Sequence, residues 1–375
     1  LLSISLTFFF LAWLLPESRI RYLKANNKTN FAIKILTLFL CALPLALLLG
    51  LRDISMGYDT ARYINSYTNM ADVSMSYAIE YYSYSYGPLY SAIAWIFSSI
   101  GGPIFCQYMI TELSAMLLIA GFEKTDDIAN SSWSIFIFLL YIGLNLADQT
   151  RQMFALSFGI YAFGALLDNR KITFAVLSII ELLIHPVSVS FVLLTILFFV
   201  LRDGKTRHSI LLAILVVATV AIPEIITSLL TFVLQSTRYT TYISEQAIIN
   251  TGTAINTGLG FIVALLPLVI PCVLYYNRIN NKELYRGPLI ACTSFGIPFR
   301  MFAYYANWLG RLFTYPLFFA SIITSSVILI ERDSTKKIDV FSLILCVGSV
   351  FVYFVITYVY ANNHGFFPVF GSAQV

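Results

Sequence analysis

The chain has 375 residues, of which 59% are hydrophobic and 11% are charged, and its formal net charge is +4. The mean hydropathy of +0.81 lies far above that of a soluble globular domain, which excludes water-soluble enzymes and nucleic-acid-binding proteins. The composition indicates an integral membrane protein.

Long apolar runs recur from one end of the chain to the other. A bilayer core about 30 Å thick requires about twenty helical residues to cross, so the spanning elements are predicted to be helices. We expect an all-α polytopic membrane protein, a single transmembrane domain over residues 1–375 with about twelve transmembrane helices. The predicted spans lie near residues 1–15, 32–51, 103–121, 132–147, 151–167, 172–185, 187–201, 209–222, 258–276, 287–305, 311–330 and 338–360.

The basic residues of the connections predict the orientation. The connection "PESRIRYLKANNKTNFAIK" carries Arg19, Arg21, Lys24, Lys28 and Lys34 against a single Glu17, and such loops are typically cytoplasmic. Later basic connections ("DNRK", "RDGKTRH", "NRINNKELYR", "ERDSTKK") fall on the same side only if one span lies between residues 52 and 122. The segment near 88–100 is therefore predicted to be a re-entrant or interfacial helix on the outer side.

The first outer segment, residues 52–88, begins "RDISMGYDTARYINSY" and is rich in tyrosine. Its tyrosines are Tyr58, Tyr63, Tyr67, Tyr77, Tyr81, Tyr82, Tyr84 and Tyr86. Tyrosine at a membrane boundary is typical of an aromatic belt. It also suits sugar binding, because the ring faces and hydroxyls match the apolar and polar sides of a sugar. Both interpretations stay open.

Further outer segments carry polar groups at the ends of spans. Asp148, Arg151 and Gln152 lie at the mouth of one span, and His185 precedes a proline that ends another. A lone histidine on an apolar helix is either a structural residue or an acid–base group. The outer loop near 223–257 contains Arg238 and Tyr239, and at about 35 residues its length favours a lid or a substrate-binding loop. Outer segments 306–311 and 361–375 complete the predicted site.

The predicted topology leaves six basic residues in or outside the membrane, and all six are arginines. They are Arg52, Arg62, Arg151, Arg238, Arg300 and Arg311. A single such arginine can simply reach a lipid headgroup. A set without any lysine favours phosphate or pyrophosphate binding, because the guanidinium pairs with phosphate oxygens through two parallel hydrogen bonds. Arg62 is also a candidate for a structural ion pair with Asp59 or Asp53.

No P-loop, Rossmann glycine pattern, HExxH motif or Cys/His metal spacing occurs in the sequence. We therefore expect neither a metal site nor a cofactor. The arginines can stabilise a pyrophosphate leaving group without metal.

Three motifs make the chain resemble the EpsG-like family of polysaccharide polymerases. These are the Wzy-type enzymes that assemble capsule, exopolysaccharide and the O-antigen of lipopolysaccharide biosynthesis. The first is Arg52-x4-Gly57-x-Asp59-x3-Tyr63 just after an early span. The second is the pair Arg151-Gln152 opening a span, followed by a basic turn and a span that ends in His185. The third is Arg311 with Tyr315 near the start of a late span. The match is strongest over residues 40–200.

The resemblance implies a GT-C-like glycosyltransferase in the bacterial inner membrane with its active site facing the periplasm or exterior. Its substrates would be undecaprenyl-pyrophosphate-linked oligosaccharides, and its partners membrane lipids and a chain-length regulator protein. Two other classes are considered: a flippase or transporter of the same lipid-linked sugars, and an O-antigen ligase-type transferase or acyltransferase. Clustering of charges outside the membrane, without an evident internal repeat, disfavours a transporter.

In the mechanism that this resemblance implies, Arg151 and Arg311 bind the donor pyrophosphate and Arg52 completes the anion site. Asp59 activates the acceptor hydroxyl, with His185 as the rival base. Sugar contacts are assigned to Tyr63, Gln152, Asp148, Tyr58 and Tyr239.

Overall fold

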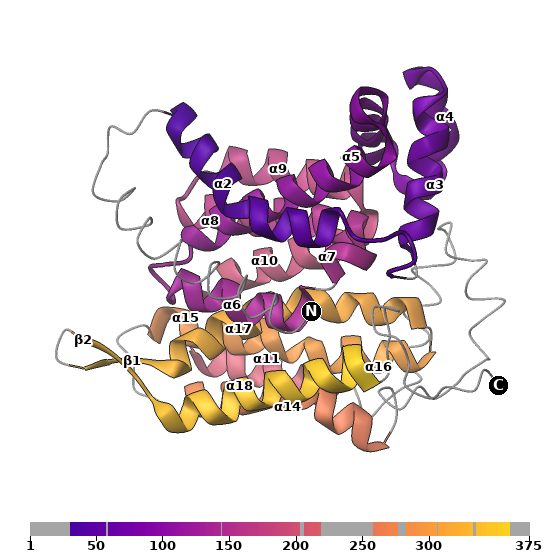
Figure 1. The fold of residues 1–375 in the computed structure, drawn as a ribbon. Coiled ribbons are helices and arrows are strands. Elements are labelled where there is room, and N and C mark those ends of the chain that lie inside the picture. The colour runs from indigo at the N-terminus through magenta and orange to yellow at the C-terminus, as the bar shows by residue number, and fades with distance from the viewer. Residues whose placement is uncertain are drawn as a thin grey trace. The chain divides into compact units, whose positions relative to one another are not determined.

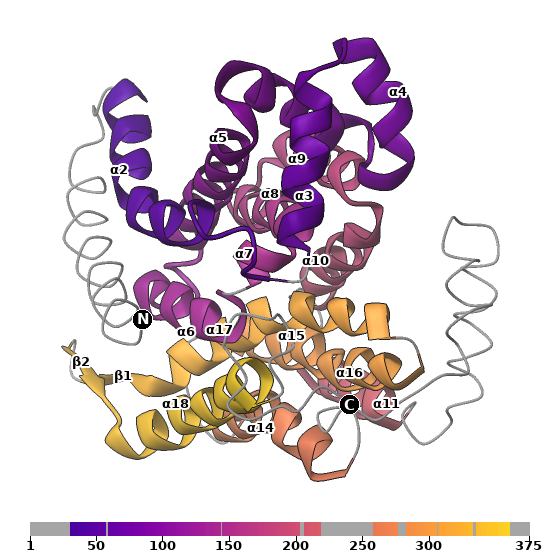
Figure 2. The ribbon, with the colours of Figure 1, turned by 45° about the vertical axis from the view of Figure 1, so that its right-hand side comes forward.

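The computed structural model describes residues 31–57, 59–143, 145–202, 206–218, 258–276, 283–305, 307–332 and 335–360. These residues are helical almost throughout (Figures 1 and 2), which confirms the predicted helical fold class. The chain divides into two compact units whose boundary falls between Val192 and Leu193. Unit 1 precedes this boundary, and unit 2 runs from Leu193 to Ala361.

Unit 1 is built around α5. Its elements are α2 (Phe31–Gly50), α3 (Thr60–Ala71), α4 (Met75–Tyr86), α5 (Pro88–Glu123), α6 (Ser131–Ile142), α7 (Asn145–Asp148), α8 (Thr150–Leu167), α9 (Lys171–Ile184), the 3-10 turn η1 (Pro186–Ser188) and the start of α10 (Val189–Arg202). Helices α2, α3, α4 and α8 all pack on α5, and α9 packs on α8. The predicted outer segment 52–88 is thus largely helical, because α3 and α4 bury tyrosine side chains against α5.

Helix α5 reverses direction in its first half. Gly102 has φ 80° and ψ −177°, a conformation that is essentially restricted to glycine. The Cys106 thiol lies 3.5 Å from the carbonyl oxygen of Ala94, although twelve residues of straight helix would separate them by about 18 Å. The helix over 88–101 is therefore folded back on the segment that follows Gly102. A separate helix at 88–100 was predicted, but its position relative to a membrane stays a prediction.

Unit 2 is built around α17 (Thr314–Ile328), in which nearly every side chain is buried. Its other elements are α11 (Thr206–Ala218), α14 (Gly258–Tyr276), α15 (Glu283–Ser294), α16 (Gly296–Tyr305), η3 (Asn307–Phe313), β1 (Leu329–Arg332), β2 (Thr335–Ile338), α18 (Val340–Phe354) and the π-helix η4 (Val355–Tyr360). The antiparallel pair β1–β2, with Leu329 opposite Ile338, is a short hairpin that joins α17 to α18 and was not predicted, and the helical fold class stands. Pairing satisfies backbone groups that a connection between two helices would otherwise leave to water.

Four of the described helical segments are long and apolar enough to cross a membrane: Ala32–Gly50, Pro88–Glu123, Gly310–Ile328 and Val340–Thr357. Four shorter apolar helices accompany them: Ser131–Ile142, Pro186–Arg202, Arg207–Val217 and Phe261–Tyr276. They agree with a polytopic helical membrane protein, whereas the number of twelve spans stays a prediction. The predicted span 287–305 is interrupted between α15 and α16. The predicted span 1–15, the end of span 209–222 and the long loop 223–257 lie outside the described residues.

Candidate functional site

Arg52 holds the turn between α2 and α3. Its guanidinium donates to the carbonyl oxygen of Leu49 at 2.5 Å and to the hydroxyl oxygen of Thr60 at 2.9 and 3.1 Å. Thr60 in turn donates to the carbonyl oxygen of Met56 at 2.5 Å. Only 8% of the Arg52 surface is exposed. Burial lowers the pKa of Arg52 to about 10, so the side chain is still a cation at neutral pH.

Gly57 makes this turn possible, since its φ of 91° favours glycine. Asp53 closes the first part of the turn by accepting hydrogen bonds from the backbone and side chain of Ser55 at 2.8 and 2.6 Å. These hydrogen bonds hold the pKa of the exposed Asp53 carboxyl below its ordinary value. Asp53 is therefore occupied as a turn residue, and Asp59 is the motif's carboxylate nearer to the interior.

Asp148 of α7 connects the turn to the start of α8. Its Oδ1 accepts a hydrogen bond from the backbone N–H of Asp59 at 2.8 Å, across 89 residues of sequence. Asp148 is 3% exposed, and its charge raises the pKa of Arg52 against the effect of burial. The half-buried Asp59 side chain makes no capping hydrogen bond to α3. A buried aspartate thus holds the backbone of a second aspartate close to an arginine.

Arg151 connects α8 to the end of α4. Its guanidinium donates to the carbonyl oxygen of Ser85 and lies over the Tyr86 ring, 5.6 Å from the ring centroid. Gly87 follows with φ 84°, and a Cβ there would lie 2.7 Å from the carbonyl oxygen of Leu183. This close approach brings the end of α9 to the α4–α5 junction. His185, 4% exposed, is the residue that ends α9 there.

Tyrosine rings fill the space beneath these polar groups. Tyr63, Tyr67, Tyr86 and Tyr90 contact one another with centroid distances of 5.6 to 6.3 Å. The Tyr67 and Tyr90 hydroxyls are hydrogen-bonded to each other. All four rings belong to the buried core of unit 1. Tyr63, predicted as a sugar contact, therefore packs within the core.

Together these groups form what we call the arginine end of unit 1: Arg52, Asp59, Asp148, Arg151 and His185. The opposite ends of α5 and α8 form the lysine end: Lys124, Asp168 and Arg170. There Lys124 pairs with Asp168, and the Arg170 Nε lies 4.0 Å from the same carboxylate. The assignment of these two ends to opposite sides of a membrane stays a prediction.

The other predicted site residues are placed as follows. Arg62 is exposed on α3, and Gln152 is buried on α8. In unit 2, the Arg300 guanidinium lies 5.7 Å from the centroid of the Phe313 ring, and Arg311 is half-buried in η3. Tyr58, Arg238 and Tyr239 lie outside the described residues. The structure brings Arg52, Asp59, Tyr63, Asp148, Arg151, Gln152 and His185 into one unit and places Arg300 and Arg311 in the other.

Sequence reasoning missed three residues that build the site: Thr60, Ser85 and Gly87. Gly87 carried a signal, because a Gly-Pro pair after a polar helix is typical of a turn. Thr60 and Ser85 act through a hydroxyl oxygen and a backbone carbonyl, and neither has a motif. Among the described residues, no group of three or more His, Cys, Asp or Glu side chains could hold a metal ion.

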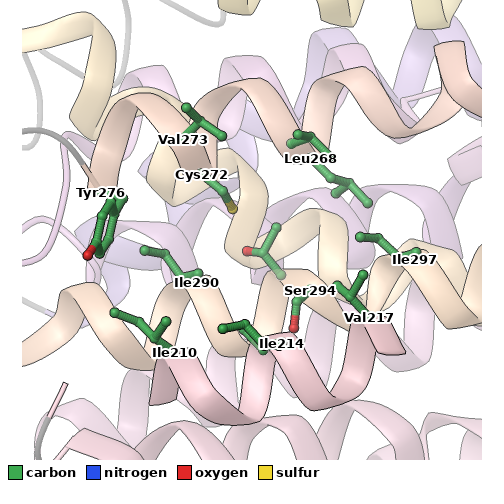
Figure 3. Close-up of a pocket in the computed structure, with 13 residues that line it drawn as sticks. Ile210, Ile214, Val217, Leu268, Cys272, Val273, Tyr276, Ile290, Ser294 and Ile297 are labelled. Atoms are coloured by element: carbon green, nitrogen blue, oxygen red, sulfur yellow. The ribbon is translucent and has the colours of Figure 1, made fainter. Parts of the chain in front are cut away.

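Unit 2 contains an apolar pocket of about 420 Å³ between α11, α14, α15 and α16 (Figure 3). Ile214, Leu268, Cys272 and Ile290 are among its lining residues, and the Ser294 hydroxyl is one of the few polar groups. No charged side chain lines it. It offers hydrocarbon contact and no group for acid–base or phosphate chemistry.

Comparison with known proteins gives one match. A family model described as "EpsG family" matches residues 4–369. No curated protein matches the chain. No solved structure matches it either. The family match covers both units.

Proposed function

The chain belongs to the EpsG family, and from this premise we propose that it joins lipid-linked oligosaccharide repeat units into a polysaccharide. Family membership indicates a membrane-bound polysaccharide polymerase of the glycosyltransferase type. The proposal adds the substrate, undecaprenyl-pyrophosphate-linked repeat units, and the location, the outer face of the bacterial inner membrane. It also adds the roles of the residues at the arginine end.

One observation carries the proposal. Four segments far apart in the sequence, 52–60, 85–87, 148–151 and 183–185, converge at one end of unit 1. They bring two arginines, two aspartates and a histidine together, from connections that the sequence-based topology predicts to lie on the outer face. Transfer from a pyrophosphate carrier needs such a set: cations for the leaving group and a base for the incoming hydroxyl.

Arg151 is the residue we assign to the pyrophosphate. It is half-buried, and within the described part of the chain its guanidinium donates to the neutral carbonyl of Ser85, so an anion would bind the guanidinium more strongly than this carbonyl does. Arg52 adds positive potential from a fixed position, since its own donors are committed to Leu49 and Thr60. Arg300 and Arg311 of unit 2, Arg62 of unit 1 and Arg238 are proposed as further phosphate-binding residues on the basis of the sequence alone.

Asp59 is the base we assign, with His185 as the alternative. The hydrogen bond from its backbone to Asp148 fixes the Asp59 main chain, while its side chain is left out of helix capping. In the proposed step the acceptor oxygen bonds to C1 of the donor sugar and the bond from C1 to the pyrophosphate oxygen breaks. The hydroxyl proton passes to the base, and undecaprenyl pyrophosphate departs. Gln152 and Asp148 are proposed to position the sugars, with Tyr58 and Tyr239, while Tyr63 supports the site from the core.

The test is a polymerisation assay in membranes that lack the native protein, with lipid-linked repeat units supplied. We expect the wild type to produce a ladder of polymer lengths. Arg151→Lys should lower the rate about 10²- to 10³-fold, because lysine cannot bridge two phosphate oxygens. Asp59→Asn should lower it about 10²- to 10⁴-fold through loss of the base.

The matched control is Arg170→Lys at the lysine end, where the side chain is 65% exposed. Equal expression and insertion of all variants would be verified first, and the control should keep wild-type activity. Repeat units that cross the membrane without forming a ladder would identify a flippase. Transfer of a finished polymer to another lipid, again without a ladder, would identify a ligase. A chain-length regulator partner stays a prediction that this assay does not address.

A further inference from the structure

The tyrosines of residues 52–90 form two groups that the sequence does not separate. One group is the buried core of Tyr63, Tyr67, Tyr86 and Tyr90 described above. The other, which we call the tyrosine row, consists of Tyr77, Tyr81 and Tyr84 on α4. These are 51%, 63% and 71% exposed, respectively. The core is buried within unit 1, whereas the row lies mostly at the surface, where the Tyr81 ring also contacts the Tyr82 ring edge-on at 4.9 Å between centroids.

The row occupies one face of its helix. Positions 77, 81 and 84 follow the i, i+4, i+7 spacing that places side chains on the same side. The Tyr77 and Tyr81 rings are parallel, with centroids 5.7 Å apart and planes 8° apart. The row covers about 10 Å along the helix. It therefore presents aligned aromatic rings over the length of a short oligosaccharide.

The surroundings of the row are polar. Ser76 and Glu80 on the same helix are exposed, and α4 is not among the described helices that are apolar enough to cross a membrane. A carboxyl group next to the rings disfavours burial of this face in hydrocarbon. The row therefore faces water or the headgroup region, and sugar binding is what distinguishes it from an aromatic belt.

The row also begins at the arginine end. Tyr84 directly precedes Ser85, whose carbonyl oxygen accepts the hydrogen bond from Arg151. Figures 1 and 2 show α4 beside α3, and α4 packs on α5. A chain growing at Arg151 would pass Tyr84 first and then Tyr81 and Tyr77.

We propose that the tyrosine row binds the growing polysaccharide chain. Aromatic faces stack on the apolar faces of sugar rings, and the hydroxyls exchange hydrogen bonds with sugar hydroxyls. This inference rests on the proposed function for the origin of the chain, and binding itself can be measured without polymerisation. The row holds the product near the site between additions, so it sets the length of the product.

The test compares two triple variants with the wild type. One replaces the row residues by alanine (Tyr77→Ala, Tyr81→Ala, Tyr84→Ala), and the other replaces them by phenylalanine, which keeps the rings. Tyr276→Ala is the matched control, because Tyr276 is a 53% exposed tyrosine in unit 2. The probe is a set of oligosaccharides cut from the polysaccharide of the cells that encode the protein. Binding to purified protein in lipid nanodiscs would be measured by saturation-transfer NMR and by titration calorimetry.

We expect the alanine variant to bind about 100-fold more weakly, a loss of about 2.7 kcal/mol shared by three ring contacts, and to make a shorter ladder. The phenylalanine variant should keep most of the affinity, and Tyr276→Ala should keep all of it. Wild-type affinity and ladder length in the alanine variant would overturn the inference. Poor membrane insertion of the alanine variant with unchanged affinity for the oligosaccharides would also overturn the inference, because that result identifies an aromatic belt. If the wild type binds the probe but makes no ladder, the proposed function fails and the binding comparison still decides the inference.

Discussion

The two ends of unit 1 contain the same kinds of charged residue in opposite environments. At the lysine end, the side chains of Lys124 and Asp168 are 20% and 35% exposed, and Arg170 is 65% exposed. At the arginine end, Arg52 and Asp148 are 8% and 3% exposed. Arg52 donates to a backbone carbonyl and a side-chain hydroxyl, and Asp148 accepts a hydrogen bond from a backbone amide 89 residues away. The lysine end uses charge at a surface, whereas the arginine end uses it as part of the folded interior.

This difference has an energetic reason. An exposed ion pair contributes about 0 to 1 kcal/mol, because water and salt screen it and the side chains lose freedom. A buried charge is tolerated only when its hydrogen bonds are satisfied, and removing one partner costs about 3 to 5 kcal/mol. Buried charges held in fixed positions by hydrogen bonds suit a site that stabilises a charged transition state, because these groups need not reorganise during the reaction. Four sets of variants test how far the comparison holds.

The largest effect is expected at Gly87. Gly87→Ala should destabilise unit 1 by about 2 to 5 kcal/mol, because it adds the strain of a positive φ to a contact of 2.7 Å with the Leu183 carbonyl oxygen. Gly102→Ala is the matched control: φ is 80°, but a Cβ would have no atom within 4 Å, and about 1 to 3 kcal/mol is expected. Thermal unfolding in detergent measures both. Equal losses would show that the contact between Gly87 and α9 does not hold the arginine end together.

Asp148 is expected to come next. Asp148→Ala removes the acceptor for the Asp59 N–H and a countercharge of Arg52, so a loss of about 2 to 4 kcal/mol is expected. Asp148→Asn keeps an acceptor oxygen and should lose about half as much. Denaturant titration of both variants would show whether the hydrogen bond or the charge dominates. A larger loss for asparagine than for alanine would contradict this assignment.

Substitution of Thr60 removes hydrogen bonds that hold the Arg52 side chain in place while leaving its charge unchanged. Thr60→Val preserves the shape but removes the acceptor for two Arg52 donors, and a loss of about 1 to 3 kcal/mol in unfolding free energy is expected. Thr68→Val on the same helix is the control, because Thr68 donates only to its own helix at the carbonyl of Ile64, and its loss should stay within about 0.5 kcal/mol. If both variants match the wild type, Arg52 does not depend on this acceptor.

The smallest effect is expected at the lysine end. Asp168→Asn should cost less than about 1 kcal/mol, and the loss should shrink further in high salt. Unfolding at low and high ionic strength measures this, with polymer length as a second readout that should not change. A loss comparable to that of Asp148→Ala would remove the distinction between the two ends.

The sequence was sufficient for the parts of the site that depend on composition and local pattern. Arg52, Asp59, Arg151 and His185 were selected because each follows or opens an apolar run, and the structure places all four in unit 1. It did not predict that residues 52–88 form two helices, because "YYSYSY" lacks the apolar period that marks a buried helix face. It also did not separate the buried tyrosines from the exposed row.

Composition and basic connections by themselves determined the class of protein. A run of about twenty apolar residues is stable in lipid as a helix, because the helix satisfies its own backbone hydrogen bonds there. Short motifs with their spacing determined the family. The tertiary structure alone decided which polar groups meet: that Asp148 holds the Asp59 backbone, that Arg151 binds the Ser85 carbonyl, and that Gly87 admits the end of α9. These contacts join residues about 60 to 100 positions apart through single backbone atoms. Every residue carries the same backbone groups, so the sequence does not show which of them will be used.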